Sequence, residues 1–182
     1  MDSMTFLLFG ATGDLAKRKI YPALYNLFSN ENIPQSISII GIGRRAMSDV
    51  EFQTKVEQSL ATFSRISTGD ESGVEEFIST FRYCQLDTAN IVGYQDLLSL
   101  VKKRETELNI PENRIFYLSV VPEVFNVIAL NIKESGLWAT KGLNRLIIEK
   151  PFGHYVTYAH EFNEELIESF DETDIYHIDH YL

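Results

Sequence analysis

The sequence predicts an α/β fold in which a doubly wound parallel sheet carries helices on both faces. Short apolar runs alternate along the chain with segments whose apolar residues recur at helical spacing, and this alternation is typical of βαβ units. The runs are apolar at consecutive positions, as in strands that are covered on both faces. Ligands of such sheets bind outside the carboxyl ends of the strands, so the residues that follow each run are the candidates for a site.

The first half of the chain predicts two strands and three helices. Residues 5–9 form a continuous apolar run that ends at Gly10, and residues 36–42 form the second run. Between them, residues 14–28 have apolar side chains at helical spacing. Ser48-Asp49-Val50-Glu51 is a capping box, which starts a helix that we expect to end near residue 63. Residues 67–73, with two glycines, predict a loop before a short helix at 74–78.

The second half predicts four further strands. Residues 81–86 form a strand, and a helix at 92–108 is ended by Pro111. A strand at 115–121 is stopped by Pro122, and the helix at 123–133 has Gly136 in its C-cap region. Residues 143–148 form a strand, 155–170 a helix with an acidic outer face, and 174–178 the last short strand.

Length and composition limit the classes of protein that are compatible. The 182 residues predict one domain over residues 1–182, and a net charge of −10 argues against binding to nucleic acid or to anionic membranes. No apolar run approaches the ~20 residues that cross a bilayer, and we expect no signal peptide. Cys84, the single cysteine, excludes an internal disulfide and a multi-cysteine metal site. We therefore expect a soluble protein of the cytoplasm without a bound metal.

A glycine motif follows the first strand. It reads Gly10-Ala11-Thr12-Gly13-Asp14-Leu15-Ala16-Lys17, in which Thr12 stands at the place of the middle glycine of G-x-G-x-x-G. Glycines let the backbone turn tightly against a pyrophosphate, and the start of the next helix presents N–H groups to that anion. The motif therefore favours a Rossmann-like dinucleotide site, with a tight turn that binds nothing as the alternative.

Two arginines follow the second strand. An NAD-binding protein usually has an acidic residue there that binds the ribose 2′-hydroxyl, whereas this chain has Arg44 and Arg45. Guanidinium groups suit a 2′-phosphate, and basic residues 17–19 add positive charge. We predict NADP as the cofactor, in preference to NAD. The alternative is that both arginines are solvated surface residues.

The third and fourth strands end in less specific residues. Asp87 and Thr88 follow the third strand and are predicted to line the adenine or ribose side of the crevice, with a helix N-cap as an equal alternative. Cys84 within that strand is interpreted as a buried structural thiol. Val121-Pro122 after the fourth strand offers an apolar wall for a nicotinamide ring, or simply terminates the strand.

Chemically versatile side chains follow the last two strands. Lys150 lies within Glu149-Lys150-Pro151, and a lysine at a strand end is placed to reach cofactor and substrate together; a surface lysine is the alternative. Asp179, His180 and Tyr181 follow the sixth strand and would put a carboxylate, an imidazole and a phenol at the same edge. Such a cluster is able to bind a phosphorylated or hydroxylated substrate and to orient a base.

Three motifs, in this order across the whole chain, resemble the signatures of the glucose-6-phosphate dehydrogenase family. They are the glycine motif after the first strand, the run Glu149-Lys150-Pro151 and the run Asp179-His180-Tyr181. The resemblance implies oxidation of glucose 6-phosphate to 6-phosphoglucono-δ-lactone with hydride transfer to NADP⁺, the entry to the pentose phosphate pathway. It also implies that residues 10–17 surround the pyrophosphate and that Arg44 binds the 2′-phosphate. Asp87 and Thr88 fall where the family contacts the cofactor.

The resemblance also implies roles at the substrate end. Lys150 would contact both cofactor and sugar, His180 and Tyr181 would bind the substrate phosphate, and Asp179 would hydrogen-bond the catalytic histidine. That histidine belongs to a second, substrate-binding and dimerisation domain, which is absent from this chain. His177 stands where the family usually has arginine, so this chain lacks any help that the arginine gives in binding the phosphate.

Three hypotheses follow for the function. The first is the coenzyme domain of a glucose-6-phosphate dehydrogenase, which alone binds NADP weakly and lacks turnover. The full-length enzyme is expected to be a homodimer, and the sequence does not determine the oligomeric state of this chain alone. The second is a non-catalytic NADP-binding sensor or scaffold. The third is another two-domain sugar dehydrogenase, which would share the Lys-Pro element but not the Asp-His-Tyr run in this place.

Overall fold

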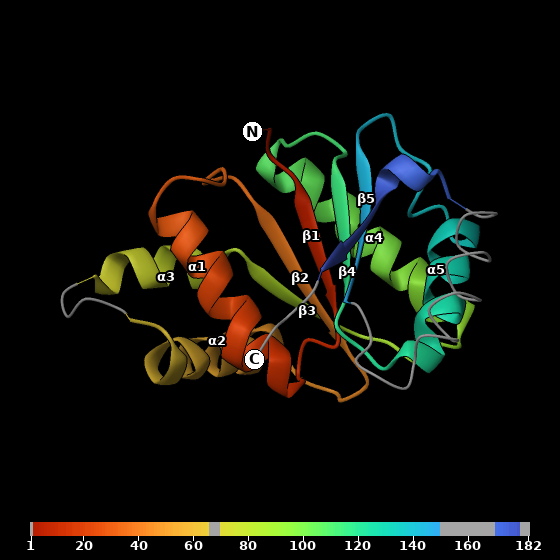
Figure 1. Ribbon diagram of the computed structural model, residues 1–182. Coiled ribbons are helices and arrows are strands. Elements are labelled where there is room, and N and C mark those ends of the chain that lie inside the picture. Colours follow the sequence, from red (N-terminus) through yellow and green to blue (C-terminus); the bar gives the residue numbers. More distant parts are fainter. Residues whose placement is uncertain (1, 66–69, 150–169, 179–182) are drawn as a thin grey trace.

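Six parallel strands form one sheet in the order β3-β2-β1-β4-β5-β6 (Figure 1). A computed structural model of the protein describes residues 2–65, 70–149 and 170–178. The first strand lies at the centre, and the chain winds outward from it in both directions, which is the strand order of doubly wound dinucleotide-binding sheets. The strands are β1 (Thr5–Phe9), β2 (Ser38–Gly43), β3 (Phe81–Gln85), β4 (Arg114–Leu118), β5 (Asn144–Glu149) and β6 (Ile175–Ile178).

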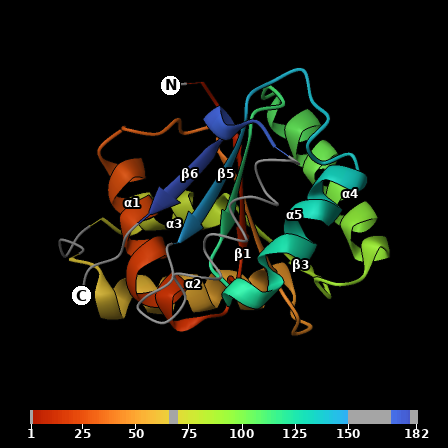
Figure 2. The ribbon, with the colours of Figure 1, turned by 45° about the vertical axis from the view of Figure 1, so that its right-hand side comes forward.

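Helices cover both faces of this sheet. One group packs on one face and consists of α1 (Tyr21–Ser29), α2 (Asp49–Phe63) and α3 (Glu71–Ser79). The opposite face carries α4 (Ile91–Leu108) and α5 (Phe125–Glu134). The two groups lie on opposite sides of the sheet in Figures 1 and 2. The predicted α/β fold is therefore confirmed.

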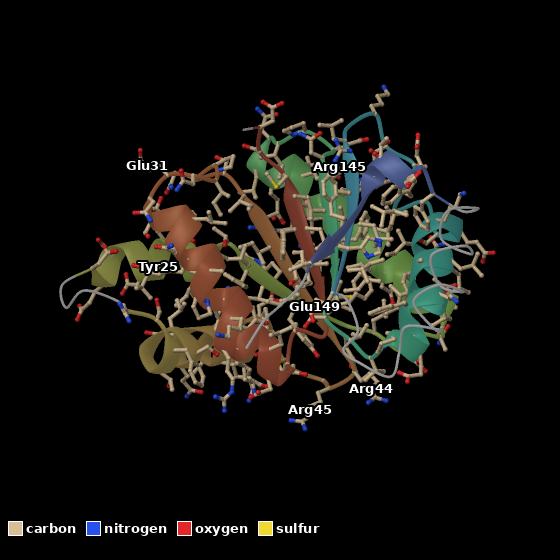
Figure 3. All side chains as sticks on the ribbon, viewed as in Figure 1. Tyr25, Glu31, Arg44, Arg45, Arg145 and Glu149 are labelled. Atoms are coloured by element: carbon tan, nitrogen blue, oxygen red, sulfur yellow. The ribbon has the colours of Figure 1, made fainter. Side chains whose placement is uncertain are left out.

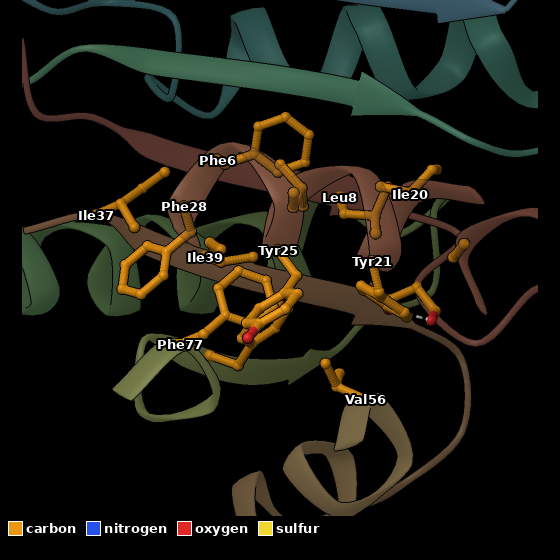
Figure 4. Close-up of a cluster of buried hydrophobic side chains, with 14 of the residues drawn as sticks. Phe6, Leu8, Ile20, Tyr21, Tyr25, Phe28, Ile37, Ile39, Val56 and Phe77 are labelled. Atoms are coloured by element: carbon orange, nitrogen blue, oxygen red, sulfur yellow. Dashed lines mark hydrogen bonds between the residues drawn. The ribbon is translucent and has the colours of Figure 1, made fainter. Parts of the chain in front are cut away.

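The core consists of two apolar layers that share the strands. Successive side chains of a strand point to opposite faces, so Phe6 and Leu8 of β1 pack with α1 while Leu7 and Phe9 pack with α4 and α5. Every residue of β1 is buried, which explains its unbroken apolar sequence. The α1 side is rich in aromatic rings, and Figure 4 shows them between α1, α3 and the sheet, among them Tyr21, Tyr25, Phe28 and Phe77.

Several local predictions need correction. The loop predicted at 67–73 is too long, because α3 already begins at Glu71. The helix predicted at 14–28 is present over residues 14–29, but its segment Ala16–Ile20 is π-helical. The helix predicted at 123–133 begins with a separate 3-10 turn at Pro122–Val124 before α5. The helix predicted at 155–170 lies, except for its last residue, outside the described residues.

Two predicted helix ends are confirmed. The Ser48 hydroxyl accepts a hydrogen bond from the Glu51 N–H at 3.1 Å, which is the expected cap of α2. Gly136 follows α5 with a φ of +92°, the left-handed conformation that ends many helices. In the described part of the chain, no helix is both long enough and apolar enough to span a membrane.

Candidate functional site

A pocket of about 360 Å³ opens at the carboxyl ends of the four strands β1 to β4. This is the crevice where the chain winds away from β1 in two directions and where ligands of such sheets bind. A second hollow, of about 540 Å³, lies between α1 and the end of α2, and none of its lining residues follows a strand. The lining of the strand-end pocket consists of Phe9, Gly10, Thr12, Gly13, Ile42, Gly43, Arg44, Leu86, Asp87, Thr88, Val120, Val121 and Val124.

The turn after β1, residues 10–13, is shaped by a close approach of two backbones. Gly10 has a φ of +86°, and a Cβ on it would lie 1.9 Å from the carbonyl oxygen of Ser119. The N–H groups of Gly10 and Ala11 both donate to the Ile42 carbonyl, at 3.1 and 3.2 Å. Because no side chain fits at Gly10, the main chain itself forms this wall of the pocket.

A buried tyrosine fixes the far side of this turn. The Tyr21 hydroxyl, at the start of α1, donates a hydrogen bond to the Ala11 carbonyl (Figure 4). Burial raises the pKa of Tyr21 well above its usual value, so the hydroxyl stays protonated and remains a donor. This contact could not be predicted, because Tyr21 has the position of an ordinary apolar residue in a helix.

Some residues of the predicted glycine motif line the pocket, and others lie in the core or on the surface. Gly10, Thr12 and Gly13 line the pocket. By contrast, Ala11 and Ala16 are buried in the α1 core, and Leu15 packs partly against it. Asp14 pairs with Arg18 at 2.9 Å on the helix surface, and Lys17 is half-buried outside the lining. The structure thus brings three of the eight predicted residues to the pocket surface.

The turn after β2, residues 43–45, carries the predicted arginines. Both side chains are exposed, and Figure 3 shows them at the lower edge of the molecule, with Arg145 at the opposite edge. Arg44 lines the pocket, whereas Arg45 does not. Arg18, one of the residues expected to add positive charge, stacks over Phe63 instead.

Donors from β3 hold this turn in place. The Gln85 side-chain amide donates to the Arg44 carbonyl at 3.1 Å, and the Tyr83 hydroxyl donates to the Arg45 carbonyl at 2.7 Å. The Leu86 N–H donates to the Gly43 carbonyl at 2.9 Å. Neither Tyr83 nor Gln85 was predicted, because their spacing is that of an ordinary half-exposed strand.

The turn after β3, residues 86–90, brings Asp87 and Thr88 to the pocket as predicted. The Asp87 carboxylate accepts from the Ala89 N–H at 3.1 Å, and α4 is capped instead by Asn90, which accepts from the Val92 N–H at 3.0 Å. The helix N-cap considered for Asp87-Thr88 therefore belongs to Asn90.

Two side chains converge on the carbonyl of Thr88. The Tyr94 hydroxyl donates to it at 2.8 Å and the Asn131 amide at 3.1 Å. Tyr94 is fully buried, and burial raises its pKa, so it stays a donor. Helices α4 and α5 thus fix this part of the pocket floor together.

An apolar side of the pocket follows β4. Val121 lines it, as the predicted nicotinamide wall requires, whereas Pro122 starts the 3-10 turn and does not. The prediction missed Val120 and Val124 beside it, and also Leu86 directly after β3. The signal was present in the sequence, since each of these residues lies within a few positions of a strand end.

The predicted substrate residues Lys150, Asp179, His180 and Tyr181 lie outside the described residues. The strands that precede them are described: β5 and β6 are neighbours in the sheet, with Glu149 and Ile178 as register partners. Glu149 raises the pKa of the Tyr117 hydroxyl on β4, adding to the larger effect of burial. In the described ranges, no group of three or more His, Cys, Asp or Glu residues is placed to hold a metal ion.

Cys84 has the environment predicted for a structural thiol. It is buried in β3 and unpaired with another cysteine. Burial, with a further contribution from Asp96, raises the pKa of the thiol to about 11. The thiolate that a reactive cysteine needs is therefore disfavoured at neutral pH.

Comparison with known proteins shows the family of the chain. Residues 7–182 match the family model described as "Glucose-6-phosphate dehydrogenase, NAD binding domain". Glucose-6-phosphate 1-dehydrogenase of Bacillus subtilis is 43% identical over 176 residues, which are 97% of this chain and 35% of that protein. The enzyme of Leuconostoc mesenteroides is 40% identical over 174 residues, 96% of this chain and 35% of that protein.

A solved structure leads to the same family. A glucose-6-phosphate dehydrogenase in complex with its substrate glucose 6-phosphate superposes with a TM-score of 0.89 at 33% identity, over 99% of this chain and 37% of that one. The chain thus spans about a third of the length of the relatives that it matches. From the family model, the sequence identity and the shared fold, we conclude that this chain belongs to the glucose-6-phosphate dehydrogenase family and matches its NAD-binding domain.

Proposed function

We propose that the chain is the NADP-binding part of a glucose-6-phosphate dehydrogenase. The observation that carries the proposal is the meeting of two turns at one crevice: residues 10–13, which line it with Gly10, Thr12 and Gly13, and residues 43–45, where Arg44 lines it. Family membership supports the same assignment. The whole enzyme would oxidise glucose 6-phosphate at C1 to 6-phosphoglucono-δ-lactone in the pentose phosphate pathway.

The pocket residues suit a dinucleotide with a 2′-phosphate. The turn after β1 lines the crevice with Gly10 and Gly13, where its main chain would face the pyrophosphate. Arg44, at the end of β2, stands where an NAD-specific protein has a carboxylate. Asp87 and Thr88 would contact the adenosine side, and Val121 would face the nicotinamide. When bound, NADP⁺ supplies the hydride acceptor.

The remaining residues of the mechanism follow from the family resemblance. Lys150 would bind the sugar and the cofactor, and His180 and Tyr181 would bind the sugar phosphate. Asp179 would orient the imidazole of a histidine in the second domain, and this histidine would take the proton of the C1 hydroxyl. We propose that the whole enzyme is a cytoplasmic homodimer, and that the 182-residue chain alone binds NADP without oxidising the sugar.

Cofactor titration of the 182-residue chain tests the proposal. We expect binding of NADP to be tighter than binding of NAD by calorimetry. Arg44→Ala should weaken NADP by about 10- to 100-fold, as expected for a lost charge-assisted contact, and change NAD by less than about twofold. Lys102→Ala is the control, because it removes a positive charge from an exposed side chain of α4 that is not part of the pocket lining. Equal affinities for both cofactors, or unchanged NADP affinity in Arg44→Ala, would contradict the proposal.

A further inference from the structure

We propose that Tyr83 and Gln85 are positioning residues for cofactor selectivity, which fix the turn that carries Arg44 and Arg45. The inference rests on the proposed NADP site and extends it to residues outside the pocket lining. The two side chains would favour NADP over NAD without contacting either cofactor.

Three successive carbonyls of the turn are bound by β3 and the residue after it. Gly43 accepts from the Leu86 N–H at 2.9 Å, Arg44 from Gln85 at 3.1 Å and Arg45 from Tyr83 at 2.7 Å. Two of these donors are side chains that lie two positions apart on β3, and such residues project from the same side of a strand. The main chain at both arginines is therefore held by side chains, in addition to the backbone contact.

Tyr83 is itself held rigidly. Its side chain is buried, with its ring centroid 5.2 Å from that of Phe52, and its N–H donates to the Asp49 carboxylate at 2.7 Å. A Cβ on Gly43 would lie 2.7 Å from the Tyr83 hydroxyl. Burial raises the pKa of that hydroxyl, so it remains a donor at neutral pH.

The arginine side chains are exposed and gain no comparable support. A long exposed side chain loses rotamer freedom when it binds a ligand. If the backbone that carries it is already fixed, binding does not have to order that backbone as well, and the total entropy cost is lower. Only a cofactor with a 2′-phosphate uses these guanidinium groups. A loosened turn should therefore weaken NADP and leave NAD unchanged, so the ratio of the two dissociation constants reports the effect.

Tyr83→Phe is the first test, because it removes the hydroxyl and keeps the ring that packs on Phe52. We expect the dissociation constant of NADP to rise about 3- to 10-fold, the size of one hydrogen bond, with that of NAD within about twofold of wild type. Tyr25→Phe is the matched control, since it also removes a hydroxyl that donates a hydrogen bond, in this case to Asp70 at 2.6 Å. Tyr25 lies on α1 and is not part of the strand-end pocket. This control should leave both constants unchanged.

A double-mutant cycle separates positioning from general stability. In a chain with both Arg44→Ala and Arg45→Ala, Tyr83→Phe should have no further effect on either cofactor. Gln85→Leu should shift the ratio in the same direction as Tyr83→Phe. Because Gln85 is exposed, this variant tests the inference even if Tyr83→Phe does not fold by circular dichroism.

The outcomes distinguish the inference from the function on which it rests. Equal weakening of NADP and NAD in the β3 variants, or no change in either, would overturn the positioning role alone. A wild-type chain that does not bind NADP would overturn the proposed function and this inference with it. A persistent effect of Tyr83→Phe without both arginines would mean that the tyrosine acts on another part of the pocket.

Discussion

The two turns at the crevice would bind their proposed phosphates in opposite ways. The turn after β1 excludes a side chain at Gly10, because the Ser119 carbonyl occupies the place of its Cβ. The turn after β2 presents two long side chains and relies on Tyr83 and Gln85 to hold its backbone. The affinity of a site made of main chain therefore depends on the space around its backbone. The affinity of a site made of exposed side chains depends on how well the backbone that carries them is fixed.

The largest effect is expected for Gly10→Ala, which attacks the turn made of main chain. The added Cβ would meet backbone that cannot move aside, and alanine is strained at a φ of +86°. We expect a loss of about 2–5 kcal/mol in the free energy of unfolding, from strain and overpacking together. Urea denaturation measures the loss.

Gly136→Ala is the control, because its φ is +92° but the nearest atom to a Cβ, in Leu98, is 3.7 Å away. Only the conformational strain, about 1–2 kcal/mol, should then remain. If both variants lose the same stability, the close approach to Ser119 is not what requires glycine at Gly10.

Gly43→Ala should have a smaller effect on the turn held by side chains. The nearest atom to its Cβ is the Tyr83 hydroxyl, so the added carbon should break the hydrogen bond of that hydroxyl to Arg45, at a cost of about 1 kcal/mol. We expect weaker NADP binding with little loss of stability. In the Tyr83→Phe background the effect should largely disappear, because the hydroxyl is gone; an undiminished effect in calorimetry would place the clash elsewhere.

A third turn, residues 86–90, lets the comparison be sharpened. Asn90→Ala should cost about 1 kcal/mol of stability, the usual value of an N-cap, because Asn90 caps α4 and is not part of the lining. NADP affinity should be unchanged. Thermal unfolding and calorimetry on the same sample measure both quantities, and a fall in affinity without a fall in stability would reverse this assignment.

The smallest effect is expected at Cys84, which lies between Tyr83 and Gln85 and reports on the integrity of β3. Its thiol pKa is raised to about 11 from 9.0, so the folded state favours the neutral thiol. This contribution to stability is complete below pH 9 and is lost as the pH rises from 9 to 11. At pH 8 a thiol reagent should label the native chain much more slowly than the urea-unfolded chain.

Tyr83→Phe should leave that labelling rate unchanged. Faster labelling would show that the substitution opens the strand, and that a change of cofactor ratio is not due to the turn alone.

The difference between the two turns also explains how much could be predicted. Gly10 could be identified from the sequence, because an apolar run followed by glycine is typical of a strand that ends in a tight turn. The apolar runs located all six strands, and with them the edge of the sheet where the pocket lies. Arg44 could be proposed from its charge and its place after β2. The hydrogen bonds that hold its turn could not be predicted, because Tyr83 and Gln85 have the pattern of an ordinary strand. The contact between Tyr83 and Arg45 also joins residues that are 38 positions apart.

Other features depended on neighbours that no local pattern identifies. Ala11 and Ala16 belong to the glycine motif but face the core. Arg114 lies fully buried on β4 against Glu105, with two contacts of 2.9 and 3.1 Å. A charged residue at a strand start predicts exposure, and only the fold shows that a carboxylate from α4 neutralises it.

The approach of Gly10 to Ser119 has a consequence for the order in which the chain is made. The Ser119 N–H also donates to the Phe9 carbonyl at 2.9 Å. The turn after β1 is therefore packed against a segment that is synthesised much later. Because a nascent chain emerges from its N-terminus, ribosome-bound chains that stop before β4 should not retain NADP. Affinity for the cofactor would then appear abruptly, once β4 has emerged and paired with β1.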